Sequence, residues 1–159
     1  MSFAVHFVPA DRVGQPVPPA ATAEHEQLTA DERATWQGLE PKLVALLGSQ
    51  VHELAETPYA AQLVHEPLGL LVTWMHGDYQ LSIPFWTGNA NAATFELLGR
   101  IVRLIEDETG LVGIDSIEHR RFSDDPTAVS EDFAGIAQGY AGASDQQSLL
   151  GWLLHKLRR

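Results

Sequence analysis

The alternation of apolar and polar positions predicts strands at several places in the chain. Phe3, Val5 and Phe7 alternate with Ala4, His6 and Val8, which is the two-residue period of a strand with one buried face. Further strands are predicted over Tyr59–Glu66, Leu70–Met75, Tyr79–Phe85 and Leu111–Asp115. Residues 76–78, His-Gly-Asp, form the tight turn between two of them.

A helical period begins after the first strand. Thr29 and Glu32 have the spacing of a capping box, in which each side chain satisfies a backbone N–H of the other residue, so a helix is expected to begin there. Its apolar face continues to Gly48. Pro41 lacks a backbone N–H, so we expect it to kink or split this helix near Glu40.

A second helix is predicted over 91–109, with Gly110 as its left-handed stop. Its apolar stripe is wide, which is typical of a helix that lies across a sheet, so we interpret it as the core helix. A weaker helix is predicted near Ser130–Tyr140. A final helix is predicted over 144–159, where Ser144 and Gln147 form another capping box.

These elements predict one α+β domain over residues 1–159, with a proline-rich loop at 9–28. The order is β-α-β-β-β-α-β followed by C-terminal helices, and short connections favour a ferredoxin-like variant. Its sheet is expected to be rich in antiparallel pairs and packed on the core helix.

The charge of the chain limits its partners. Asp and Glu number 21 against 10 Lys and Arg, giving a net charge of −11, which repels phosphate backbones and anionic lipids. We therefore expect no nucleic-acid or membrane binding. The chain has no cysteine and no leader pattern, and it contains no apolar run long enough to span a bilayer, so a cytoplasmic location is expected.

The histidines offer the candidate chemistry. None of the seven has the spacing that presents two ring nitrogens to one metal, and no glycine-rich phosphate loop occurs, so no metal and no cofactor are predicted. His65 lies beside Glu66, and His76 lies near Asp78. Each pair combines a base with an orienting carboxylate. The alternative hypothesis is therefore a small acid/base hydrolase that uses His65, His76 or the carboxylates from Glu106 to Asp115.

Acidic residues gather around the end of the core helix. A helix C-terminus already carries partial negative charge, so Glu106, Asp107 and Glu108 are unfavourably placed unless something compensates them. The structural interpretation is that Arg103 pairs with Glu106 or Asp107 at helical spacing. The functional interpretation is an acidic patch, which Asp115 and Glu118 join and which meets a basic protein partner.

The last helix carries an apolar face that must be covered. The face consists of Leu149, Trp152, Leu153 and Leu157. Such a face is too apolar to remain in water beside an acidic domain, so we expect it to dock on its own domain or on the twin of a homodimer. The chain is thus predicted to be a monomer or a homodimer.

Several of these features resemble a group of small bacterial α+β proteins. The resemblance is carried by Met1–Phe3, Ile83–Trp86, Glu108–Gly110 and Asp115, within about half of the chain. This chain departs from the group's pattern at Ser116, where the group has a proline. Some members look like immunity proteins encoded with secreted toxins. The resemblance therefore implies, with the absence of catalytic motifs, a non-catalytic protein-binding domain of the immunity or regulatory type.

Overall fold

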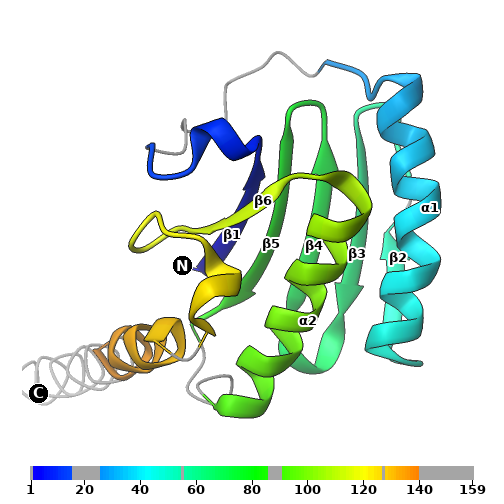
Figure 1. The fold of residues 1–159 in the computed structure, drawn as a ribbon. Helices are drawn as coiled ribbons and strands as arrows, with labels where there is room; N and C mark the ends of the chain where they lie inside the picture. The colour runs from blue at the N-terminus through cyan, green and yellow to red at the C-terminus, as the bar shows by residue number, and fades with distance from the viewer. Residues whose placement is uncertain (1, 16–25, 55, 86–90, 127, 140–159) are drawn as a thin grey trace, which may run out of the picture.

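The computed structural model describes residues 2–15, 26–54, 56–85, 91–126 and 128–139. In chain order the elements are β1 Ser2–Val8, η1 Ala10–Arg12, α1 Ala30–Leu47, β2 Val51–Leu54, β3 Ala60–His65, η2 Glu66–Leu68, β4 Leu70–Met75, β5 Asp78–Pro84, α2 Ala92–Thr109, β6 Val112–Asp115 and η4 Phe122–Asp124. Strand β1 precedes the helix α1, strands β2 to β5 follow one another between α1 and α2, and strand β6 follows α2 (Figure 1).

The strands form one antiparallel sheet with the order β2-β3-β4-β5-β1-β6. Within it, β6-β1-β5-β4 have the neighbours of a ferredoxin-like β-α-β-β-α-β unit, because β1 lies between β5 and β6, the two strands that α2 connects. The β2-β3 hairpin is inserted between α1 and β4 and lengthens the sheet. The predicted α+β fold is confirmed.

The sheet has one strand more than predicted. This strand, β2, covers Val51-His52-Glu53-Leu54, where only the two end residues are apolar. No two-residue period can be read from four such residues. Pairing with β3 defines the strand, and that pairing brings Val51 opposite His65.

The core lies between one face of the sheet and the two long helices. Val5, Leu81, Val72 and Leu63 lie side by side across four strands and are all buried. In Figure 1, α2 crosses the front of the sheet and α1 lies beside it near β2 and β3. Buried side chains of the helices complete this core. They are Trp36, Leu39, Leu43 and Leu47 from α1, and Phe95, Leu98, Ile101, Val102 and Ile105 from α2.

The helix ends follow the predicted capping chemistry. Thr29 caps α1, and the complete capping box with Glu32 is present. Gly110 ends α2 in the left-handed conformation, with a φ of 71°.

Pro41 does not split α1, which is continuous from Ala30 to Leu47. Buried Leu39 and Leu43 on either side of Pro41 anchor the helix, so packing offsets the loss of one backbone hydrogen bond.

The predicted weak helix is present over residues 128–139 (orange in Figure 1). Val129, Phe133 and Ala137 are buried at helical spacing, and the ring centroid of Phe133 lies 5.2 Å from that of Phe95. The predicted helix over 144–159, with its docking face of Leu149, Trp152, Leu153 and Leu157, lies outside the described residues, as do residues 16–25 of the proline-rich loop. Among the described residues, we find no helix with the length and apolarity that a membrane span requires.

Candidate functional site

Glu106, in the predicted acidic patch, faces the interior. Its side chain is only 8% exposed and accepts hydrogen bonds from the backbone N–H of Gly113 at 3.1 Å and from the hydroxyl of Ser123 at 3.3 Å. The guanidinium of Arg121 holds both carboxylate oxygens at 3.3 Å. The ion-pair partner of Glu106 is therefore Arg121, and the expected pairing with Arg103 is replaced by this longer-range contact.

Asp115 is fully buried at the end of β6. Its Oδ1 atom accepts hydrogen bonds from the backbone N–H groups of Ile117 at 3.0 Å and Glu118 at 2.6 Å. Its Oδ2 atom lies 3.6 Å from Nε of Arg120, whose Nη2 atom donates to Asp132 at 2.9 Å. Asp115 thus fixes the loop that presents Glu118.

The remaining members of the predicted patch are on the surface. Asp107, Glu108 and Glu118 are exposed, and Glu108 forms an ion pair with Lys42 of α1. Asp107 precedes β6 and Glu118 follows it, so the two lie beyond opposite ends of that strand. The structure therefore divides the predicted patch into two internal carboxylates and three external ones.

Of the two candidate histidines, His65 is a core residue. It is 8% exposed at the end of β3, where it lies opposite Val51 and Leu70. Burial lowers the pKa of His65 and so favours the neutral ring. Its neighbour Glu66 is exposed and lies 3.5 Å from His52 instead. The predicted pairing of His65 with Glu66 is absent from the contacts of the described residues.

His76 does meet carboxylates, although not the predicted one. It lies in the turn between β4 and β5, and its Nδ1 atom is 3.0 Å from Oε2 of Glu32. Its Nε2 atom is 3.1 Å from Oε2 of Glu26. The hydrogen bond with Glu32, the charge of Glu32 and the charge of Glu26 raise the pKa of His76. Asp78, the predicted partner, lies 3.9 Å from His6.

Glu32 is the centre of this group, which we call the Glu32 cluster: Glu26, Glu32, His76, Gly77 and Tyr79. Besides the ring of His76, the Glu32 carboxylate accepts the backbone N–H of Gly77 at 3.2 Å and the hydroxyl of Tyr79. It also accepts the backbone N–H and the hydroxyl of Thr29 at 2.8 and 2.9 Å. A carboxylate offers about four lone-pair sites, so these donors saturate it.

The ionisation of the cluster follows from these bonds. Partial burial by itself raises the pKa of Glu32, but hydrogen bonds from Tyr79, His76 and Thr29 outweigh it and lower that pKa to about 2. Burial and the bond to Glu32 raise the pKa of Tyr79. Since a general base works best with a pKa near the working pH and a free lone pair, Glu32 is poorly suited to proton transfer. The cluster instead fastens the start of α1 to the β4-β5 turn.

The residues that carried the predicted resemblance have structural positions. Ile83 is buried near the end of β5, Gly110 ends α2 and Asp115 ends β6, while Trp86 lies outside the described residues. The backbone N–H of Ser116 donates to the carbonyl of Ala4 at 2.9 Å, a bond that the proline expected there could not form.

In the part of the chain that the structure describes, no three potential ligands gather around a metal site. Comparison with known proteins found no matching family model, no similar curated protein and no similar solved structure.

Proposed function

We propose that the protein is a non-catalytic binding domain, of the immunity or regulatory type, that acts in the cytoplasm on a basic protein partner. Its contact residues are the three exposed carboxylates Asp107, Glu108 and Glu118. The net charge of −11 supports this, because it favours association with a cationic surface and disfavours anionic ones.

The observation that carries the proposal is the rigid loop that presents Glu118. Asp115 accepts the N–H of Glu118, and the N–H of Asp115 donates to the carbonyl of Arg120 at 3.0 Å, which closes the loop on itself. Ser116 joins the loop to β1 through both its N–H and its hydroxyl. A loop that is already ordered loses little conformational entropy when a partner binds.

Internal pairing also favours a net acidic surface. Arg120 and Arg121 lie in the same loop as Glu118, yet Asp115, Asp132 and Glu106 engage their guanidinium groups. Their positive charges are therefore partly neutralised within the fold, whereas Glu118 is exposed to solvent. Electrostatic attraction through such a surface gives fast association that weakens as salt screens it.

The test is a pull-down with the full chain from the source cell, followed by mass spectrometry. Wild type is compared with Asp107→Asn/Glu118→Gln, and with the control Asp11→Asn/Asp31→Asn, which removes two exposed charges from η1 and the first turn of α1. We expect a basic partner that wild type and the control retain and the first variant loses. Loss from both variants, or recovery of no partner at low ionic strength, would count against the proposal.

The alternative is a small acid/base hydrolase centred on His76. The observation that favours it is the grouping of a histidine, carboxylates and a tyrosine in the Glu32 cluster. A panel of ester and phosphoester substrates, assayed with wild type and His76→Gln, distinguishes the two functions. Turnover that the substitution abolishes in a folded protein would favour the hydrolase; its absence leaves binding as the better account.

A further inference from the structure

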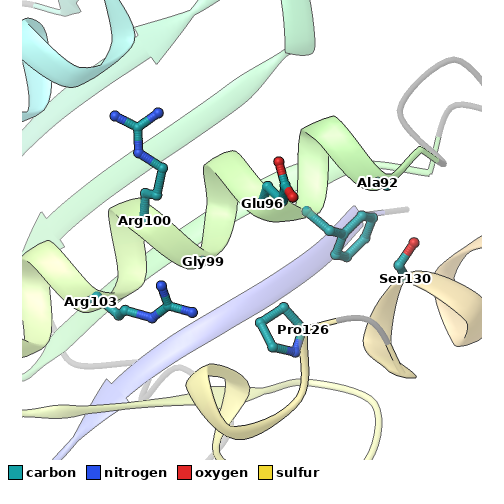
Figure 2. Close-up of a pocket in the computed structure, with 8 residues that line it drawn as sticks. Ala92, Glu96, Gly99, Arg100, Arg103, Pro126 and Ser130 are labelled. Atoms are coloured by element: carbon teal, nitrogen blue, oxygen red, sulfur yellow. The ribbon is translucent and has the colours of Figure 1, made fainter.

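A cavity of about 450 Å³ lies between α2 and the first turns of the helix that begins at Pro126 and continues over 128–139 (Figure 2). Phe95 and Gly99, both buried, line it from the side of α2, and Pro126 and Ser130 line it from the other side. The volume falls within the range of small-ligand pockets, and the lining is divided evenly between apolar and polar or charged residues.

Two arginines of α2 border this cavity, Arg100 and Arg103. In Figure 2, Arg103 extends towards Pro126, while Arg100 and Glu96 point to the other side of the helix. Among the described residues, no carboxylate lies within ion-pair distance of either arginine. By contrast, carboxylates engage four other cations of the described chain, namely Arg33, Lys42, Arg120 and Arg121. In so acidic a chain, a cation without a carboxylate partner beside a cavity indicates a site for an external anion.

Gly99 leaves the space between Arg103 and Pro126 open. A Cβ atom at position 99 would lie 3.6 Å from Cγ of Pro126 and 4.0 Å from Nη2 of Arg103, which are ordinary contact distances. Packing therefore does not require a glycine here, although glycine is less favourable than alanine in a helix interior. What the glycine does provide is room between the guanidinium and the opposite wall.

The opposite wall is already fixed in place. Oδ1 of Asp125 accepts the backbone N–H of Ala128 at 3.0 Å, the bond of a helix N-cap, and Pro126 follows at a position where helices accept proline. Phe122 before this segment and Phe133 after it are fully buried against Phe3. The cavity is therefore preformed, and a ligand would not have to order its walls.

We propose that this cavity binds a ligand with one carboxylate and a short apolar body, and that Arg103 holds the carboxylate. The apolar body would lie against Phe95 and Pro126. The net charge of −11 disfavours ligands with several negative charges, so a monoanion fits better than a polyphosphate or a nucleic acid. The same chemistry occurs in a free carboxylic acid and at the C-terminus of a peptide.

The test follows the backbone amide signals of the full-length, isotope-labelled protein by NMR. The probes are hexanoate, the uncharged 1-hexanol, and one short peptide ending in leucine, prepared with a free carboxylate and as the amide. We expect saturable shifts at Gly99, Arg103 and Ser130, with a dissociation constant for hexanoate on the order of 1 mM. Preference for hexanoate or for the free peptide identifies the source of the carboxylate.

Three variants separate this site from nonspecific binding. Arg103→Gln should weaken binding at least about tenfold, because it removes a charge-assisted hydrogen bond. Arg12→Gln, which removes an exposed arginine of η1 without an ion pair among the described residues, should leave binding unchanged. Gly99→Ala should keep the fold and weaken binding. The proposal is overturned if no probe shifts these amides, if the neutral probes bind as well as the anions, or if Arg103→Gln binds like wild type.

Discussion

The carboxylate of Glu32 lies 3.0 Å from Nδ1 of His76, which joins the first turn of α1 to the turn between β4 and β5. Tyr79 binds the same carboxylate through its hydroxyl and stacks on Trp74, with ring centroids 3.9 Å apart. Trp74 in turn lies near Trp36 of α1, with ring centroids 6.2 Å apart. The partly buried carboxylate of Glu32 is thereby linked to the aromatic part of the core.

Replacing this carboxylate should destabilise the fold. Glu32→Gln keeps the size of the side chain but removes its charge and replaces an acceptor oxygen with a donor, which leaves Thr29 or Tyr79 without a partner. We expect a loss of about 2 kcal/mol in the free energy of unfolding, measured with urea. Asp31→Asn, in the same turn of α1, is the control, and an equal loss there would contradict the assignment.

Acid should weaken the contact that Glu32 makes between α1 and the β4-β5 turn. A carboxyl whose pKa is lowered in the folded state, here from 4.5 to about 2, contributes stability that is present above pH 4.5 and is lost as the pH falls towards 2. The urea midpoint of wild type should therefore fall more steeply between pH 5 and pH 3 than that of Glu32→Gln. Parallel curves for the two proteins would show that Glu32 titrates normally.

A rise in pH should weaken the same contact between α1 and the β4-β5 turn, because His76 loses its proton. The pKa of His76 is raised above 6.5 by its hydrogen bond with Glu32 and by the charge of Glu32. Its contribution to stability is therefore complete below pH 6.5 and is lost as the pH rises through the folded-state pKa. NMR titration of the ring should give a pKa above 6.5 that falls in Glu32→Gln. A value of 6.5 or less in wild type would refute the contact.

Gly113 in β6 is required by packing. A Cβ atom there would lie 2.7 Å from Cγ1 of Val102 and 3.0 Å from Cγ1 of Val5, both buried. Gly113→Ala should therefore lower the free energy of unfolding by about 1 to 3 kcal/mol. Gly135→Ala is the matched control, because its Cβ would meet nothing within 4 Å; it should stabilise the helix over 128–139 by about 0.5 to 1 kcal/mol. A higher thermal midpoint for Gly113→Ala than for Gly135→Ala would contradict this packing.

Ser116 should stabilise the contact between β1 and the loop after β6 that presents Glu118. Its hydroxyl accepts the backbone N–H of Ala4 at 3.1 Å. Ser116→Ala leaves this N–H without its acceptor, which should cost about 1 to 2 kcal/mol. Ser82→Ala, on a neighbouring strand, is the control. If thermal unfolding does not distinguish the two variants, the bond contributes nothing.

The sequence predicted most elements because their signals are local. The capping box at Thr29, the stop at Gly110 and the alternation of Phe3, Val5 and Phe7 each depend on residues within a few positions of one another. The split predicted at Pro41 did not occur, since the cost of one lost bond is local whereas the packing that offsets it comes from α2 and the sheet.

The candidate sites were less predictable, because side-chain partners are set by the folded chain. Helical spacing paired Glu106 with Arg103, but Arg121 reaches Glu106 from the loop beyond β6. The spacing of Glu32 indicated only its capping role, and its contacts with His76 and Tyr79 join segments far apart in sequence. The cavity beside Arg103 likewise depends on Pro126, which follows α2 only after another strand.

The central position of β1 constrains how the chain can fold. β1 is made first, but its partners are β5 and β6, and Val5 pairs with both Leu81 and Asp115. The β2-β5 meander can form from neighbouring residues, whereas β1 must wait for the rest of the sheet. Folding dominated by such distant pairings is slow, and the apolar face of Phe3, Val5 and Phe7 remains open to aggregation meanwhile. A ribosome must therefore release the chain beyond Asp115 before the sheet can close.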